Sequence, residues 1–443
     1  MNQNTSMDFS VPNPGLSLLG RKIAFSTLVQ YAGKAVQLVL AMLTLKLVSN
    51  YLVEGDYGGY AKISEYALFF STAANLGIFA NVVRFMADRP KDGSIFLNAL
   101  VLRIFTALLF FLSGMLYLVL TGASQVFILG TMVFFGALIF DYVTSVCDGM
   151  LQANYLMGRA TIALVAGRVT QYVATLFIIK SFPAALDTSS LFMIFGAIMA
   201  GSLVTMILSF IFAARQIVWD FKISGALCLK IFEVSLPFGI INIINNLYFR
   251  FLPDYFATQA LTDGQFASFN ISFRIAMVAS LVSTFLMFSV LPGLLQYIDG
   301  QHWHKAHLLF NKIWKILAVL GVLLFIGGWL FGSFGIEFLT HKKYILPEFW
   351  FVLPMMLFLA AVSYGYDLVL ITLFAMTEDL WFIKQEVKAL ALSLVVFGLS
   401  YLVSGAQLKL LMIVGAAILA ESFIVISGAI RIKKKFRELA AQK

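Results

Sequence analysis

Twelve stretches of mostly apolar residues, each more than 20 residues long, make up most of this chain. About 20 apolar residues suffice for a helix to cross the hydrocarbon layer of a membrane, and inside lipid only helices and closed barrels satisfy their own backbone. We therefore predict an all-α polytopic membrane protein with about twelve transmembrane helices. The predicted spans are 22–49, 58–86, 96–120, 125–152, 159–181, 189–214, 229–258, 264–298, 309–333, 347–375, 381–404 and 408–431.

Composition excludes a soluble protein. Hydrophobic residues account for 61% of the 443 positions and charged residues for 12%, whereas soluble domains carry about 25% charge. The net charge of +9 would suggest nucleic acid as a partner of a soluble protein. In a membrane protein it indicates basic loops that face anionic lipid headgroups. We expect membrane lipids as partners and no nucleic acid.

The connectors between the spans are short, none exceeding about fifteen residues. Such connectors leave no room for a folded domain outside the membrane, which argues against a membrane glycosyltransferase or ligase. The one Gly-Lys pair, Gly33-Lys34, lacks the upstream glycine of a phosphate-binding loop. We expect no enzymatic activity, no cofactor and no metal site.

Lysine and arginine lie mostly on one side of the predicted membrane. With the N-terminus inside, eighteen basic residues fall in inner connectors and tails, and four, Lys180, Lys342, Lys343 and Lys409, fall outside. Cytoplasmic loops are typically enriched in these residues. Both termini are therefore predicted to be cytoplasmic.

A weak internal repeat divides the chain into two sets of six spans. An offset of 209 residues places Arg21 over Lys230 and Glu65 over Arg274, and aligns the aromatic openings of the second and eighth spans. Repeats of six spans have the same orientation and are related by an axis along the membrane normal. We predict a tail over 1–20, a six-helix bundle over 21–216, and a second bundle with a basic tail over 217–443.

Several motifs resemble one family of transporters. They are Leu19-Gly20-Arg21, the acidic turn Glu54-Gly55-Asp56-Tyr57-Gly58-Gly59-Tyr60, the segment Asn75 to Phe85, Leu151-Gln152-Ala153 before Gly158-Arg159, and Leu236-Pro237-Phe238. Together they resemble the polysaccharide-transport family of O-antigen and capsule flippases, within the multidrug/oligosaccharidyl-lipid/polysaccharide exporter superfamily. One departure is that the acid after Arg250 lies four residues on, at Asp254.

The resemblance implies a flippase of the bacterial cytoplasmic (inner) membrane that acts in polysaccharide or lipopolysaccharide O-antigen biosynthesis. It would carry an undecaprenyl-diphosphate-linked oligosaccharide to the periplasmic leaflet by alternating access, with a proton or a sodium ion as coupling ion. The alternatives are a cation-coupled multidrug exporter of the same superfamily and a peptidoglycan-precursor flippase.

Charged and polar residues within the spans are the candidate substrate site, because such residues are costly in lipid and usually face a cavity, a partner or an ion path. On the first span Gln30, Lys34 and Gln37 share one face, and on the seventh Asn242, Asn246 and Arg250 recur every four residues. Arg168 and Arg274 add cations from the fifth and eighth spans. Together these cations could hold a diphosphate, since arginine binds phosphate oxygens in a bidentate manner.

The alternative interpretation is that these charges neutralise one another. The predicted spans also hold the acids Glu65, Asp141, Asp148, Glu233, Asp254, Asp367 and Glu421, against the bases Lys34, Lys46, Lys62, Arg168, Arg250 and Arg274. Arg250 would then pair with Asp254, one helical turn away. Glu65, Asp141, Asp367 and Glu421 are also the candidates for binding a coupling ion.

Overall fold

The computed structural model describes residues 14–78, 82–83, 85–86, 89, 91–154, 156–182, 189–340 and 343–441. Its long helices are α1 (Pro14–Tyr51), α2 (Glu54–Asn75), α4 (Gly93–Leu120), α5 (Gln125–Ala153), α6 (Met157–Ser181), α7 (Ser189–Ala214), α8 (Gly225–Asn246), α9 (Leu252–Ala260), α10 (Asp263–Asp299), α11 (Trp303–Thr340), α12 (Val352–Ala375), α13 (Asp379–Ser400) and α14 (Ala406–Ala441). A π-helical turn, Leu247–Phe251, joins α8 to α9, and a 3₁₀ turn, Pro347–Phe349, precedes α12.

These helices confirm the predicted all-α membrane fold. Ten helical segments in the described part of the chain are long and apolar enough to cross a membrane. Helices α2 and α13 complete the twelve expected spans, although charged residues such as Lys62, Glu65, Lys384 and Glu386 lower their hydropathy. Of the predicted tail, residues 1–13 lie outside the described residues, and 14–20 belong to α1, which has Pro14 at its first position.

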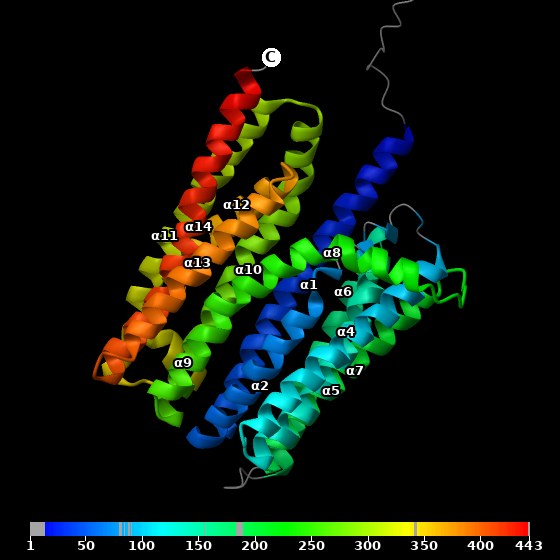
Figure 1. The fold of residues 1–443 in the computed structure, drawn as a ribbon. Coiled ribbons are helices and arrows are strands. Elements are labelled where there is room, and N and C mark those ends of the chain that lie inside the picture. Colours follow the sequence, from blue (N-terminus) through cyan, green and yellow to red (C-terminus); the bar gives the residue numbers. More distant parts are fainter. Residues whose placement is uncertain are drawn as a thin grey trace, which may run out of the picture.

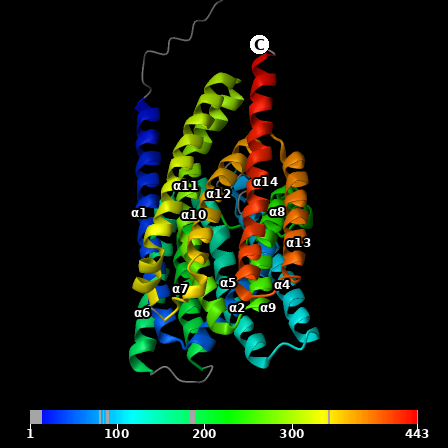
Figure 2. The same cartoon turned by 90° about the vertical axis from the view of Figure 1, so that its left-hand side faces the viewer.

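The helices form two bundles. Helices α1 to α7, the first bundle, pack mainly against one another, and α9 to α14 pack likewise in the second bundle. Helix α8 contacts both, because it packs against α2 and α4 as well as against α13. Figure 1 shows the second bundle on the left, the first on the right and α8 crossing between them. Helix α1 begins and α14 ends at one end of the molecule (Figures 1 and 2), here called the tail end.

Helix α2 ends earlier than the sequence predicts. The prediction extended this helix to residue 86, but it stops at Asn75 because Leu76 and Gly77 adopt left-handed conformations with φ of 43° and 67°. A side chain at Gly77 would lie 2.8 Å from the Phe238 ring on α8. The close crossing of α2 and α8 thus needs a glycine here. Arg84, part of the motif and of the charge count, lies outside the described residues, as do Lys342 and Lys443.

The seventh predicted span is interrupted in its second half. Five residues of π-helix, which include Arg250, separate α8 from α9. Pro253, at the second position of α9, lacks the N–H that a regular helix would bond four residues back. Single π-helical turns within helices often occur at functional sites. The interruption therefore marks Arg250 as a position with unusual backbone geometry.

Hydrogen bonds between the bundles gather at the end opposite the tails, here called the far end. Asn50 Nδ2 on α1 donates to the carbonyl oxygen of Leu339 on α11 at 2.7 Å. Lys62 Nζ on α2 contacts Asp263 Oδ1 on α10 at 2.8 Å. Helix α2 contributes most of these contacts, since it packs against α8, the π turn, α9 and α10. These contacts hold the two bundles together at the far end, in addition to the packing of α8 against α2 and α4.

Candidate functional site

A cavity of about 250 Å³ lies between the two bundles and is lined by three arginines. Arg168 comes from α6 in the first bundle, Arg250 from the π turn, and Arg274 from α10 in the second bundle. No carboxylate is among the described residues that line this cavity. The rest of the wall is formed by Ala41, Met42, Thr44, Leu45, Val48, Tyr60, Gln171, Phe273, Met277 and Val278. The predicted convergence of cations from both halves is thus seen for three of the four.

Two of these arginines share one carboxylate. Arg250 Nε contacts Glu65 Oε2 at 2.5 Å, and Arg274 Nη2 contacts Glu65 Oε1 at 3.4 Å. Arg274 also donates to Asn270 Oδ1 at 2.7 Å and to Ser64 Oγ at 2.8 Å. Glu65 is 5% exposed, so the carboxylate is removed from solvent. Two cations thus face the carboxylate of Glu65, and the buried carboxylate of Asp254 lies beside the same network.

The ion pairs of Glu65 cross from one bundle to the other. Glu65 and Ser64 belong to α2, whereas Arg250 and Arg274 belong to the second half. Positions 65 and 274 are separated by the repeat offset of 209 residues. Residues equivalent under a two-fold axis meet only when they lie close to that axis. This contact therefore places the cavity near the axis expected for the repeat.

Asp254 lies beside this network but is not the partner of Arg250. Its side chain is 6% exposed, and neither carboxylate oxygen accepts a hydrogen bond from the described residues. Asp254 and Glu65 both line a second cavity of about 300 Å³ between α2, α4, α5, α9 and α10, where most of the other walls are aromatic. Under the alternative interpretation Arg250 would pair with Asp254, but in the structure its ion pair is with Glu65.

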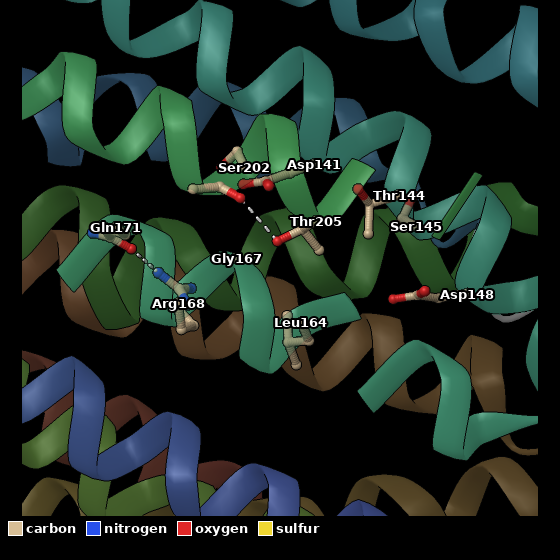
Figure 3. Close-up of a pocket in the computed structure, with 11 residues that line it drawn as sticks. Asp141, Thr144, Ser145, Asp148, Leu164, Gly167, Arg168, Gln171, Ser202 and Thr205 are labelled. Atoms are coloured by element: carbon tan, nitrogen blue, oxygen red, sulfur yellow. Dashed lines mark hydrogen bonds between the residues drawn. The ribbon is translucent and has the colours of Figure 1, made fainter. Parts of the chain in front are cut away.

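A third cavity, of about 240 Å³, lies inside the first bundle between α5, α6 and α7 (Figure 3). It contains Asp141 and Asp148, and it shares Arg168 and Gln171 with the central cavity. Arg168 Nη1 donates to Gln171 Oε1 at 2.8 Å, and Ser209 Oγ contacts Asp148 Oδ1 at 3.1 Å. The shared residues connect the acids of the first bundle to the cationic cavity.

Glycines allow α6 and α7 to approach closely beside this third cavity. A Cβ atom on Gly167 would lie 1.8 Å from Thr205 Oγ1 and 2.6 Å from the carbonyl oxygen of Gly201. A Cβ atom on Gly201 would lie 2.8 Å from that of Gln171. Small residues at helix interfaces bring backbones together in membranes. This approach fixes the position of Arg168, which follows Gly167 directly.

The other predicted substrate residues lie outside the central cavity wall. Lys34, Gln30 and Gln37 lie on α1 on the tail-end side of Ala41, with Lys34 about 10 Å from it along the helix. Asn246 Nδ2 donates to the carbonyl oxygen of Asn242, within α8. Neither asparagine is among the residues that line the three cavities.

The remaining candidate acids lie deep in the second bundle. Glu421 is 1% exposed and accepts a hydrogen bond from Asn245 Nδ2 at 3.2 Å. Asp367 accepts one from Ser283 Oγ at 2.5 Å. Together with Glu65 beside the central cavity and Asp141 in the first bundle, the four candidates therefore occupy three separate places.

Two buried charged residues were missed by the sequence analysis. Arg103, 4% exposed, donates to the carbonyl oxygen of Ala74 at 3.0 Å and lies over the Tyr142 ring, where it satisfies the end of α2. Glu386 is fully buried and accepts a hydrogen bond from Tyr366 at 2.7 Å. Both lie within the predicted spans 96–120 and 381–404, so a full count of charges there would have found them.

The cationic cavity can bind an anion with several phosphate or carboxylate oxygens. A guanidinium offers five N–H donors in a planar fork that matches such oxygens. Three of them around one cavity concentrate donors from three helices.

Residues 19–298 of the chain match a family model described as polysaccharide biosynthesis protein. The chain belongs to this family.

Solved structures of similar fold are transporters. An inward-facing multidrug-resistance transporter of the MATE family in the MOP superfamily is 12% identical, with a TM-score of 0.70 over 94% of this chain and 99% of that chain. An outward-facing MATE transporter is 14% identical, with a TM-score of 0.68 over 94% and 96%. A MOP-superfamily transporter from Pyrococcus furiosus, described by a binding pocket of reversed polarity, is 14% identical, with a TM-score of 0.68 over 95% and 96%. No curated protein matches the chain.

At these identities the likeness concerns the fold alone. Together with the ten candidate membrane spans, this fold agrees with a multi-pass membrane protein of the polysaccharide biosynthesis family.

Proposed function

We propose that this protein is a flippase that moves an undecaprenyl-diphosphate-linked oligosaccharide from the cytoplasmic to the periplasmic leaflet of a bacterial inner membrane by alternating access. The observation that carries the proposal is the cavity lined by Arg168, Arg250 and Arg274, with cations from both bundles. Membership in a polysaccharide biosynthesis family supports a glycan as the cargo.

The cavity chemistry fits the diphosphate of such a lipid. An unpaired charge inside a membrane costs several kcal/mol or more, so an anion crossing it needs cations that stay on the protein. The cavity volume of about 250 Å³ lies below the range of about 300–1,000 Å³ for sites that enclose a whole ligand. We therefore assign this cavity to the diphosphate, with sugar and lipid extending beyond it.

Lys34 and the orientation complete the proposal. With both termini cytoplasmic, as the distribution of basic residues favours, the tail end faces the cytoplasm. Lys34 lies on the tail-end side of the cavity on α1. We propose that it meets the diphosphate on its way from the cytoplasm, with Gln30 and Gln37 on the same face and Asn242 and Asn246 on the facing half. Any coupling proton or sodium ion would bind at Glu65, Asp141, Asp367 or Glu421.

The cavity charge separates this proposal from the alternatives only in part. Three arginines disfavour the cationic drugs that a multidrug exporter would carry. A peptidoglycan-precursor flippase would bind the same diphosphate group, so only the identity of the transported glycan distinguishes the two functions. Neighbouring genes for glycosyltransferases and sugar-nucleotide synthesis would favour the oligosaccharide, and an isolated gene that confers drug resistance would contradict it.

The test is surface glycan in a deletion strain that carries variants of this gene. Arg250→Ala and Lys34→Ala should each abolish surface glycan, while Arg250→Lys should retain part of it because charge remains although the bidentate fork is lost. Lys46→Ala is the matched control, since Lys46 also lies on α1 but contacts the Phe338 ring outside the cavity. Equal amounts of membrane-inserted protein must be verified. Full glycan in the Arg250→Ala strain would refute the proposal.

A further inference from the structure

Glu65 occupies the position that an anionic ligand would take between two cavity arginines. Its two oxygens contact Arg250 Nε at 2.5 Å and Arg274 Nη2 at 3.4 Å. Both arginines also line the central cavity, whereas Glu65 lines the neighbouring cavity. A carboxylate and a phosphate oxygen pair present the same geometry to a guanidinium. Glu65 is thus an internal anion held at the edge of the proposed substrate site.

This internal anion also joins the two bundles. Glu65 belongs to α2, the helix of the first bundle that makes most of the contacts to the second, and its arginine partners lie on the π turn and α10. Arg274 is further tied to α2 through Ser64 Oγ at 2.8 Å. An anion that took both arginines from Glu65 would therefore remove charged contacts that hold α2 to the second bundle.

A second ion pair between the same two helices provides a natural control. Lys62, which lies three residues before Glu65 on α2, contacts Asp263 on α10 at 2.8 Å. Its side chains are 26% and 59% exposed, so the pair is far more solvated than Glu65. Neither Lys62 nor Asp263 lines the central cavity. Because a solvated ion pair contributes little to stability, its loss should barely shift the two bundles and should leave anion binding in the cavity nearly unchanged.

We propose that Glu65 is an internal competitor of the substrate diphosphate, and that exchange of Glu65 for diphosphate on Arg250 and Arg274 releases α2 and opens the far end of the transporter. This inference rests on the proposed function for the identity of the anion. The exchange couples two events that alternating access must link, namely loading of the cavity and separation of the bundles at the opposite side. Such coupling requires that the ligand bind one conformation better than the other.

Binding of inorganic pyrophosphate to the purified full-length protein tests the competition. Glu65→Gln keeps the side-chain shape and removes the competing charge, so it should bind pyrophosphate about tenfold more tightly than the native protein. Asp263→Asn should bind as the native protein does. Glu65→Asp, which keeps the charge on a shorter side chain, should fall between them and serves if the glutamine variant does not fold. Equal affinity in all four proteins would overturn the competition.

Distance measurements between spin labels test the opening. Labels at the exposed residues Thr121, in the turn after α4, and Ser404, in the turn before α14, report on the two bundles at the far end. Pyrophosphate should lengthen this distance in the native protein and in Asp263→Asn, but not in Glu65→Gln, where the distance is already long. If pyrophosphate binds and the native distance stays unchanged, Glu65 does not couple binding to opening.

These outcomes are separate from the surface-glycan test. If deletion leaves surface glycan intact while pyrophosphate still competes with Glu65, the proposed cargo is wrong and the exchange applies to another phosphate-bearing substrate. If deletion of the gene abolishes surface glycan while pyrophosphate binds the four proteins with equal affinity, the flippase assignment is supported. The proposed competition between Glu65 and the diphosphate is then contradicted.

Discussion

Single charged residues in this protein are best understood through their partners across the bundle interface. Arg250 pairs with Glu65, 185 positions away in the chain, rather than with Asp254 on the next helical turn. Removing one member of a buried ion pair leaves the other charge uncompensated, which typically costs about 3–5 kcal/mol. The stability of the interface therefore depends on keeping Glu65 and its arginines balanced.

The partner of Arg250 can be identified by paired substitutions. Arg250→Ala should destabilise the purified protein strongly, because Glu65 then keeps only the longer contact to Arg274. Adding Glu65→Ala should recover most of that loss, whereas adding Asp254→Ala should not. Thermal unfolding in detergent measures this difference. If Asp254→Ala instead recovered the lost stability, Arg250 would pair with Asp254, one helical turn away, in the purified protein. Neither double variant should restore surface glycan, since both lack a cavity arginine.

The sequence predicted which arginines converge but not how they are paired. The sequence identified Arg168, Arg250 and Arg274 as candidates because a charge deep in an apolar span is costly and usually faces a cavity or a partner. Helical spacing shows which residues share a face of one helix, and so it pointed to Asp254. Pairing between helices depends on how the bundles pack, which one sequence does not contain. The place of Lys34 outside the cavity wall has the same origin.

Helices were predicted more accurately where a membrane boundary coincides with a turn. The predicted spans 125–152 and 189–214 match α5 and α7 to within one residue. The predicted span 408–431 falls ten residues short of the end of α14, because hydropathy reports lipid burial and not helix length. The end of α2 at Asn75 depends on left-handed residues that pack against α8. Hydropathy cannot predict a helix end that depends on packing between helices.

Close packing of α6 on α7 gives a prediction with an internal control. Gly167→Ala should lower stability by about 1–3 kcal/mol, because its Cβ atom would overlap Thr205 and force the helices apart. Gly196→Ala on α7 should be neutral to slightly stabilising, since a Cβ atom there meets nothing within 4 Å. Chemical unfolding of both variants in detergent tests this. The prediction fails if the two variants unfold alike.

The C-terminal part of α14 is anchored to the turn before α13 by a charge cluster at the tail end. Glu378 accepts hydrogen bonds from Lys435 Nζ at 2.6 Å and from Arg431 Nη2 at 2.9 Å. Burial acts to raise the pKa of Glu378, but the hydrogen bonds and charges of Lys435 and Arg431 outweigh it and hold the pKa below its usual range. The ionised carboxylate is therefore favoured in the folded protein.

This shift predicts how stability depends on pH. Because the folded pKa of Glu378 is lower than the unfolded one, its contribution is complete above the ordinary glutamate pKa and is lost as pH falls through the folded value. Glu378→Gln should therefore lower stability near neutral pH and leave it nearly unchanged at the lowest pH. Melting temperatures of both proteins across that range provide the measurement. A constant difference at every pH would rule out titration of Glu378 as the cause.

At the scale of the whole molecule, the proposed orientation makes opposite predictions for the two ends. Alkaline phosphatase, which is active only outside the cytoplasm, should be inactive when fused after residue 443 and active when inserted near residue 342. The reason is the excess of lysine and arginine in the connectors on the side of the tails. The reverse pattern of activity would show that the transporter has the opposite orientation in the membrane. The proposed direction of transport would then be wrong.

The contact between Glu65 and Arg274 also bears on how the protein arose. Two identical halves paired about a two-fold axis would bring the same residue face to face at this position, and two glutamates or two arginines would repel. Opposite charges can meet there only if the halves differ in sequence. If the proposed repeat reflects the duplication of a six-helix gene, the pair dates from after the two copies were joined in one chain, when each copy could change without changing the other.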